Sequence, residues 1–316
     1  MEPIVDAEDQ IESGQLYRHS KRENWGIAVF LWERDEKRAF RFADGEVRIF
    51  KKGFYELMVP AKPPGDGTAA KLLATVDAGD KKLEILPSVG DQLMFMLSEY
   101  PRGFIGEAWT KKHRGRGRRL KRHRDAAITE ARELLEPKAI AALHEAEDHA
   151  EVLARWIKVL AGTDLVPSSH IKKLEAIAAE AQAGLSETLV ALAQKPRQEG
   201  ALRRLQAALV SAHGPATSWQ VLTATLSLLD PVHHVCVRPS VFATQGAIVV
   251  AGFRAPARAN EAGYQRYLEV ARLVQVELAE LGHSPTDMFD VYDFVWTTLR
   301  PAARAELTES DGEATN

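Results

Sequence analysis

Carboxylate side chains recur at every third position close to the end of the chain. Asp287, Asp290 and Asp293 would follow one side of a helix, with a small drift because the helical repeat is 3.6 residues. Two such carboxylates could share a divalent cation, which is the chemistry of a metal-dependent nuclease. Phe289 and Val291 between them indicate helix packing instead, and an acid at a helix start is favourable in itself. We therefore assign no metal ligand and no catalytic residue, and keep a nuclease as an alternative.

A second cluster of reactive side chains, His233, His234 and Cys236, lies in a short segment bounded by prolines. Adjacent histidines rarely face one ion together, and no second cysteine exists to complete a zinc site. The prolines on both sides indicate a packed turn between helices. Arg238 follows an apolar run and needs an anion if it is buried. We expect an aspartate of residues 287–293 to supply that anion.

The strongest charge signal is a basic segment, residues 111–124, in which nine lysines and arginines occur without a single acid. Six of the nine are arginines, whose planar guanidinium group binds phosphate at two points. A cationic run in a chain of net charge −3 must find anions, and nucleic-acid phosphates are the first expectation. An acidic protein partner, the acidic segments of the chain itself, or mere solvation are the alternatives. The candidate nucleic-acid-binding residues are Lys111, Lys112, Arg114, Arg116, Arg118, Arg119, Lys121, Arg122 and Arg124.

The local sequence predicts how this basic segment is presented. Gly115 and Gly117 interrupt its first half, so residues 111–117 are predicted to be a mobile arm. From Arg118 onward, apolar residues at helical spacing predict a helix whose first turns carry the remaining cations. Cations at a helix N-terminus oppose the macrodipole, and a bound anion would relieve that repulsion.

Short strands are predicted between Gly14 and Pro60, at residues 15–19, 26–32, 38–43 and 46–50. Asp44-Gly45 is a strong hairpin signal between the last two. Strands of about five residues joined by tight turns are typical of a small, strongly bent barrel of the SH3/Tudor type. A further hairpin, at 72–77 and 81–86, could extend it.

The segment Gln15-Leu-Tyr-Arg-His-Ser-Lys-Arg-Glu-Asn-Trp-Gly-Ile-Ala-Val, with Phe40-Arg-Phe-Ala-Asp-Gly-Glu-Val-Arg-Ile-Phe further on, resembles a bacterial pattern. It is similar to the Tudor/SH3-like barrels of RNA-polymerase-associated factors, namely CarD-type regulators and RapA-type and UvrD-type helicases. The resemblance covers about 45 residues, and Ser20 stands where such barrels often have proline. It implies docking on RNA polymerase, or on another protein that works on DNA, rather than catalysis. The partner-binding candidates it implies are Tyr17, Arg18, His19, Trp25 and Phe50, although Trp25 and Phe50 also suit the core.

The rest of the chain is predicted to be helical. The spacing of Ser88 and Asp91 fits a capping box that begins a helix over 92–98. The fold class is therefore α+β, a small N-terminal barrel followed by a mainly α-helical region. The expected divisions are a disordered acidic leader (1–13), the barrel with its extra hairpin (14–87), a short helix and basic arm (88–117), a long helical pair (118–195), a helical domain (196–305) and an acidic tail (306–316).

Composition excludes several classes of protein. One cysteine rules out a disulfide scaffold, and no apolar run reaches the length of a membrane span. The N-terminus lacks the pattern of a signal peptide, so we expect a cytoplasmic protein. No phosphate-binding loop, nucleophile elbow or dinucleotide motif occurs, so no cofactor is expected and catalysis is not assigned.

The sequence predicts a non-enzymatic accessory protein of bacterial transcription or DNA transactions. Its barrel would dock on a protein such as RNA polymerase, and its basic arm would bind DNA phosphates. The expected partners are nucleic acid, preferably DNA, and a protein, but no membrane, and the helices could also mediate homo-oligomerisation. Two alternatives stay open: a protein–protein scaffold whose basic arm pairs with acidic segments, and the metal-dependent nuclease.

Overall fold

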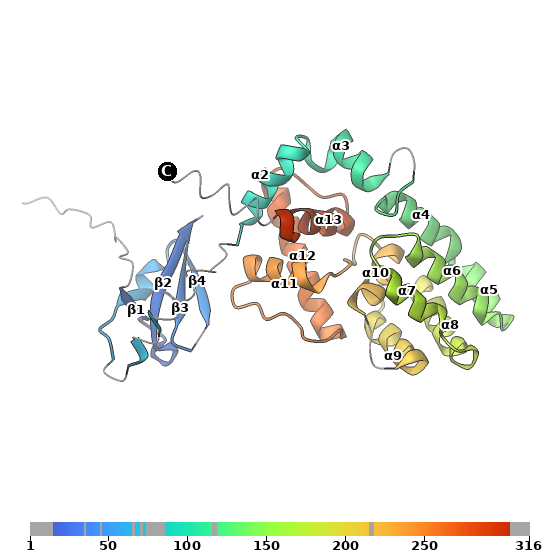
Figure 1. The fold of residues 1–316 in the computed structure, drawn as a ribbon, viewed down its shortest axis with the longest axis horizontal. Helices are drawn as coiled ribbons and strands as arrows, with labels where there is room; N and C mark the ends of the chain where they lie inside the picture. Colours follow the sequence, from blue (N-terminus) through green and yellow to red (C-terminus); the bar gives the residue numbers. More distant parts are fainter. Residues whose placement is uncertain are drawn as a thin grey trace, which may run out of the picture. The chain divides into compact units, whose positions relative to one another are not determined.

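The computed structural model describes residues 15–34, 36–44, 46–64, 67–69, 72–73, 86–115, 119–214 and 218–303. The chain divides into an N-terminal unit that ends at Ile85 and a helical unit that begins at Leu86. The fold is α+β, as expected from the sequence (Figure 1). The acidic leader and the acidic tail lie outside the described residues, as does most of the hairpin expected at 72–86. Leu72 and Leu73, at its expected start, are helical rather than extended.

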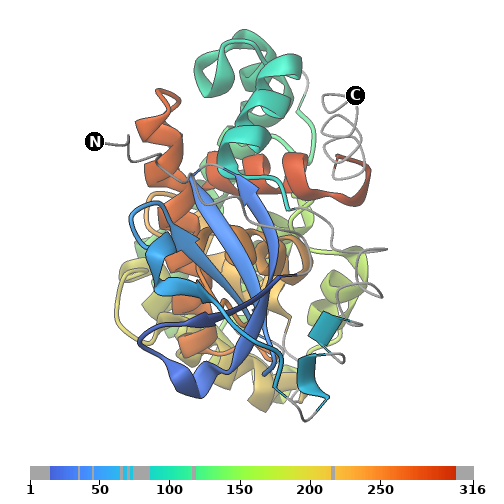
Figure 2. The ribbon, with the colours of Figure 1, turned by 90° about the vertical axis from the view of Figure 1, so that its left-hand side faces the viewer.

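The N-terminal unit is a five-stranded antiparallel sheet with the strand order β4-β3-β2-β1-β5 (Figure 2). β4 and β5 are the two edges, so the strand pairing that the structure describes does not close the sheet into a ring. The register of β2 against β3 shifts between Phe30 and Trp32, and such a bulge bends the strand. The strands are β1 (Leu16–His19), β2 (Ile27–Arg34), β3 (Lys37–Phe42), β4 (Val47–Lys51) and β5 (Met58–Pro60), with single 3₁₀ turns at Glu23–Trp25 and Tyr55–Leu57.

Each face of the sheet carries a cluster of buried side chains, and β2 contributes apolar residues to both clusters. Ala28 joins one cluster of buried side chains, which includes Tyr17 and Phe40. Val29, the next residue, joins another with Leu16. Successive side chains of a strand point to opposite faces, so a continuous apolar run lets β2 pack against a buried cluster on each face.

The helical unit surrounds one hydrophobic core that runs from Val89 to Leu299. α2 packs against both α12 and α13. The helices are α2 (Val89–Glu99), α3 (Glu107–Trp109), α4 (Arg124–Leu134), α5 (Pro137–Glu145), α6 (His149–Ala161), α7 (Ser168–Glu175), α8 (Ala179–Gln194), α9 (Ala201–His213), α10 (Trp219–Leu229), α11 (Pro239–Val249), α12 (Glu261–Glu280) and α13 (Met288–Leu299), with a 3₁₀ turn at Gly103–Ile105 and a π-helical turn at Thr110–Arg114.

The capping box at the start of α2 is confirmed. The Ser88 side chain accepts a hydrogen bond from the Asp91 backbone amide at 3.1 Å. The Asp91 carboxylate in turn accepts the Ser88 backbone N–H at 2.7 Å. Two amides that the first helical turn leaves unpaired are satisfied in this reciprocal way.

The long helical pair expected over 118–195 is five shorter helices, α4 to α8. Pro137 opens α5, and Gly162 caps α6. A further break separates α7 from α8. The residues on either side of position 195 also share one core, so the segments expected at 118–195 and 196–305 pack together.

Candidate functional site

Two arginines of the basic segment are bound to the aspartates of α13. Both terminal nitrogens of Arg114 donate to the Asp287 carboxylate, each at 2.8 Å. Arg124 donates to both oxygens of Asp293, at 2.9 Å from Nε and 2.6 Å from Nη2. These four residues are 9% exposed or less. Two-point pairs of this kind fix the planar guanidinium group in one orientation.

Acids outside α13 complete the coordination of both guanidinium groups. Nη2 of Arg114 lies 2.8 Å from the Asp125 carboxylate. Nη1 of Arg124 donates to Asp164 at 2.6 Å. The side chains of Asp125 and Asp164 remain about half exposed, so they form the solvent-facing rim of the cluster.

Asp290, the middle aspartate, is fully buried and takes different partners. One oxygen accepts the indole N–H of Trp109 at 2.9 Å, and the other accepts the Thr286 backbone amide at 2.8 Å. Arg114 lies 3.6 Å from the first of these oxygens. Asp287, the N-cap residue of α13, therefore lies on the same side as Asp290 and Asp293, as their spacing predicted. Together the three aspartates bind Trp109, Arg114 and Arg124.

The two deeper aspartates titrate in opposite directions. Burial would raise the pKa of Asp293, but the charge of Arg124 and the hydrogen bonds from His113 and Arg124 outweigh it and lower the pKa to about 2. For Asp290, burial dominates over Arg114 and the Trp109 hydrogen bond, and its pKa is raised. Asp293 is thus held as a carboxylate, whereas Asp290 is the acid in the cluster that takes up a proton more readily.

Residues 110–114 form a π-helical turn rather than a mobile arm, which corrects the expectation for this part of the segment. His113 is buried and stacks on the Trp109 ring, with the ring centroids 4.1 Å apart. The turn ends at Gly115, which has a φ of 94°, and a Cβ there would lie 2.6 Å from the Cβ of His123. Only glycine suits that conformation and that close approach.

The helix expected from Arg118 begins at Arg124 instead. Residues 119–123 are turn and extended backbone, and the Lys121 carbonyl accepts the Asp164 amide at 3.2 Å. This arrangement keeps most of the cations out of the first helical turn, where they would oppose the macrodipole.

The nine cations therefore fall into separate groups. Arg114 and Arg124 are buried anchors, so their guanidinium groups cannot reach a phosphate in this structure. The Arg119 side chain is half exposed and is paired with Glu130 on α4. Arg116 and Arg118 lie outside the described residues. The remaining cations, which form no ion pair with a described carboxylate, are exposed Lys111, Lys112 and Lys121 and part-exposed Arg122.

The partner-binding candidates of the N-terminal sheet are mostly core residues. Tyr17, His19 and Phe50 are each less than 9% exposed. His19 packs between Trp25 and Phe50, with ring centroids 4.8 and 5.7 Å away. Only Arg18 and part of Trp25 reach the surface of the sheet. An aromatic residue in so small a unit is needed for the core before it can serve a partner.

A guanidinium group already occupies the face of Trp25. Arg48 lies 4.4 Å from the ring centroid of Trp25 and 4.5 Å from that of Phe42. Its two terminal nitrogens donate to the Asp44 carboxylate at 3.1 and 2.7 Å. The cation–π position on this surface is thus filled from within the same hairpin.

The segment with His233 and Cys236 is a packed turn, as expected. Cys236 is fully buried, and burial raises the pKa of its thiol to about 12, so it is not a nucleophile at neutral pH. Arg238 does not meet an aspartate of α13, which corrects that expectation. It donates to the Tyr292 hydroxyl at 2.8 Å and to the Asp164 carbonyl at 2.9 Å. The α13 aspartates bind Arg114 and Arg124 instead, which lie about 170 residues away in sequence.

Sequence reasoning missed four participants in this region: Trp109, Asp125, Glu130 and Asp164. None stands in a local pattern, because each acts only through a contact with a residue brought close by the fold. The sequence gives the types of these residues but not which residues they contact in the folded chain.

In the part of the chain that the structure describes, no group of three or more His, Cys, Asp or Glu side chains is placed to hold a metal ion. Both oxygens of Asp287 are occupied by Arg114, and those of Asp290 by Trp109 and Thr286. None of the described helices combines the length and apolar content that a membrane span requires. No protein-family model, curated protein or solved structure matches this chain.

Proposed function

We propose that this chain is a non-enzymatic accessory protein that binds nucleic acid through the exposed part of its basic segment. The observation that carries the proposal is the unpaired state of Lys111, Lys112 and Lys121, which lie on the surface without a described carboxylate partner. Unpaired surface cations attract phosphates because binding releases the counterions condensed on the nucleic acid. Contacts of this kind read charge rather than base sequence.

The buried anchors support this function indirectly. Arg114 and Arg124 hold the described parts of the basic segment, residues 111–115 and 119–124, on the helical unit. Cations on a fixed surface lose less conformational freedom on binding than cations on a mobile arm. The anchoring therefore favours phosphate binding even though the anchors themselves make no contact with phosphate.

A charge-reversal triple variant tests the proposal. Lys111→Glu/Lys112→Glu/Lys121→Glu should weaken retention of a 30-base-pair duplex by at least tenfold in a gel-shift assay at low salt. The matched control is Lys138→Glu/Lys172→Glu/Lys173→Glu, which changes the net charge equally at exposed positions of α5 and α7. The control should keep more of the wild-type affinity than the test variant. Equal affinities for the two variants would refute the proposal.

The N-terminal sheet is proposed to dock on a protein such as RNA polymerase. The resemblance of its sequence to the Tudor/SH3-like barrels supports this, and so does the antiparallel order in which β5 pairs with β1 after a 3₁₀ turn. Exposed Arg18 is the residue on which to test it. Arg18→Glu should weaken capture of purified bacterial RNA polymerase, whereas Lys62→Glu should not, and unchanged capture by Arg18→Glu would count against docking through this surface.

A scaffold function is the second candidate, because the basic segment demonstrably accepts carboxylates. Arg114, Arg119 and Arg124 each pair with an acid of the same chain. An acidic protein segment could occupy the exposed lysines in the same way. A short duplex that displaces a bound protein partner would favour the nucleic-acid function, whereas a partner that stays bound would favour the scaffold.

A further inference from the structure

A hollow of about 440 Å³ lies beside the basic segment, where the end of α6 meets residues 119–121. Three cations line it, Arg119, Lys121 and Lys158, and Glu130 is the acid among its lining residues. Its remaining walls are the Leu120 side chain and the small residues Ala161 and Gly162. The hollow holds many times the volume of one water molecule, about 30 Å³, so a phosphodiester group fits within it.

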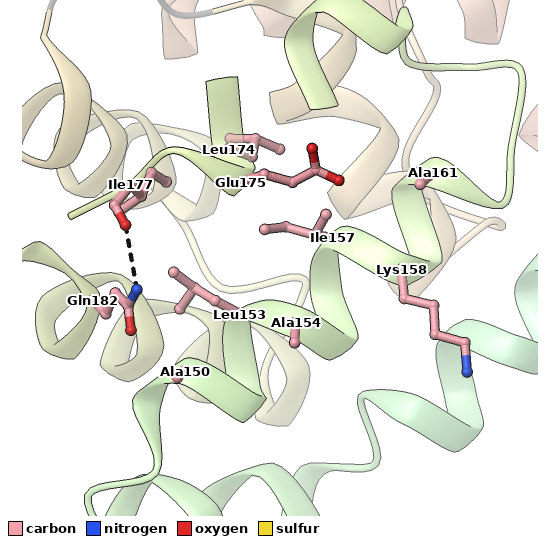
Figure 3. Close-up of a pocket in the computed structure, with 10 residues that line it drawn as sticks. All are labelled: Ala150, Leu153, Ala154, Ile157, Lys158, Ala161, Leu174, Glu175, Ile177 and Gln182. Atoms are coloured by element: carbon pink, nitrogen blue, oxygen red, sulfur yellow. Dashed lines mark hydrogen bonds between the residues drawn. The ribbon is translucent and has the colours of Figure 1, made fainter. Parts of the chain in front are cut away.

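Lys158 is the cation that the basic segment itself does not supply. It lies in the last turn of α6, is exposed, and forms no ion pair with a described carboxylate. The same helix also borders a second groove, which Leu153, Ile157 and Leu174 line together with Lys158 and the polar residues Glu175 and Gln182. Figure 3 shows the Lys158 side chain extending away from these apolar residues. Its ammonium group is therefore free to take part in the basic hollow.

Arg119 is already paired with Glu130, another residue that lines this hollow. Its Nη2 donates to Oε2 of Glu130, whose side chain is largely buried. Gly162 lies directly against this pair: a Cβ there would stand 3.0 Å from the Glu130 oxygen and 3.1 Å from the Arg119 nitrogen. The absence of a side chain at Gly162 thus gives the ion pair its room at the edge of the hollow.

We propose that this hollow is a phosphate-binding site for the nucleic-acid backbone, formed by Lys121, Lys158 and Arg119, with Glu130 as an internal competitor for Arg119. The proposal rests on the proposed function and extends the site to a helix outside the basic segment. When a phosphate enters, Arg119 exchanges its carboxylate for the ligand, and both lysines contribute charge. Part of the binding free energy is spent on breaking the ion pair with Glu130.

Lys158 also has a purely structural role to be separated from this one. A cation in the last turn of a helix complements the negative end of its macrodipole. That role would affect the stability of α6 but not the salt dependence of nucleic-acid binding. The number of phosphates neutralised sets the slope of log K against log salt, about 0.9 per phosphate on a duplex.

Glu130→Gln is the decisive variant, since it keeps the shape of the side chain and releases Arg119. It should bind a 30-base-pair duplex about three- to tenfold more tightly than wild type, because no ion pair has to be broken, whereas the salt slope should not change, since Arg119 reaches the phosphate in both proteins. Glu133→Gln is the matched control, because Glu133 is an exposed acid on the same helix with no ion pair to a described arginine. It removes the same charge without freeing a cation, so its affinity should stay closer to that of wild type.

Lys158→Ala should lower the affinity severalfold and flatten the slope by about 0.9, while Lys158→Arg should restore both. Lys138→Ala, at an exposed position of α5, should change neither the affinity nor the slope. Urea unfolding of each variant separates loss of folding from loss of binding.

The outcomes distinguish this site from the function on which it rests. If the triple lysine variant of the basic segment still binds duplex as its control does, the proposed function itself fails. If that variant loses binding but Glu130→Gln behaves as Glu133→Gln and Lys158→Ala as Lys138→Ala, only the phosphate site is wrong. Inorganic phosphate binding that Lys158→Ala abolishes, with unchanged duplex affinity, would also overturn the assignment to nucleic acid.

Discussion

Arg114 and Arg124 show that the environment of a residue, and not its place in a basic run, decides what it binds. Both carry the same charge as their exposed neighbours, yet each is buried against a carboxylate of α13. The desolvation of such an ion is tolerated only when a well-aligned counter-charge is present. Once both are in place, a phosphate would have to displace an acid that is already in contact at two points.

Removing one partner of the deepest pair should therefore be costly. Asp293→Ala leaves Arg124 buried without its two-point acceptor and should lower the free energy of unfolding by about 3–5 kcal/mol. Arg124→Met/Asp293→Leu removes both charges and should cost less than the single change. Urea unfolding midpoints measure both. Glu130→Ala, which breaks the more exposed pair with Arg119, should cost about 1 kcal/mol or less, and a comparable cost for all three would contradict this account.

The lowered pKa of Asp293 predicts how the free energy of unfolding depends on pH. The pKa of Asp293 is about 2 in the folded chain, well below its ordinary value near 3.9. Its contribution, about 2–3 kcal/mol, is complete above about pH 4 and is lost as the pH falls toward 2. Protonated Asp293 resembles asparagine, so the difference in stability between wild type and Asp293→Asn should shrink across this window. Urea titrations at pH 7, 5, 4 and 3 test it, and a constant difference would contradict the assignment.

Asp290 contributes with the opposite sign. Its pKa is raised by burial, so its stabilising contribution belongs to the protonated form and is lost as the pH rises through the folded pKa. The comparison of wild type with Asp293→Asn cancels this contribution, because Asp290 is present in both proteins.

At the scale of helices and strands, periodicity predicted most of what the structure contains. The four N-terminal strands and the capped start of α2 follow from local sequence pattern. Local pattern failed at residues 119–123, where a helix was expected and irregular backbone is found. The deciding contacts there are made with Asp164 and the aspartates of α13, far along the chain. The spacing of charged residues along the sequence does not show which distant acid each arginine will pair with in the folded chain.

Two glycines inside helices illustrate how packing changes the effect of one substitution. A Cβ on Gly246 of α11 would lie 2.4 Å from ring atoms of Phe253, whereas a Cβ on Gly184 of α8 would meet nothing within 4 Å. Gly246→Ala should therefore destabilise the chain by about 1–3 kcal/mol through overpacking. Gly184→Ala should stabilise it by about 0.5–1 kcal/mol, because alanine favours the helix. Thermal melts of the two variants should move in opposite directions, and shifts of the same sign would contradict the packing argument.

At the scale of the whole molecule, a net charge of −3 conceals the separation of acids and bases along the chain. Folding then neutralises part of the basic segment from within. The part left outside is smaller than the sequence indicates, because two of the nine cations are buried and one is paired with Glu130. The nine candidate residues predicted from sequence therefore outnumber the cations that the folded chain leaves on its surface without a described carboxylate partner.

This reduced count sets a limit on the salt dependence of duplex binding. Six cations of the basic segment remain when the two buried anchors and Arg119 are set aside, and the proposed phosphate site adds Arg119 and Lys158. The slope of log K against log salt should therefore be no steeper than about −7 for the wild-type chain. Filter binding between 50 and 200 mM salt measures it. A slope near about −9 would mean that Arg114 and Arg124 also reach phosphates and that the buried pairs open on binding.

The ion pairs with α13 also bear on how the protein is made. Arg114 and Asp287 are separated by 173 positions, and Arg124 and Asp293 by 169. At about 5–20 residues per second, a ribosome needs roughly 10–30 seconds to synthesise the stretch between them. Throughout that interval the nascent chain holds both arginines without the aspartates of residues 287–293, and only Asp125 and later Asp164 are available to them. Synthesis of residues 287–293, rather than any earlier step, first allows the two buried pairs to form.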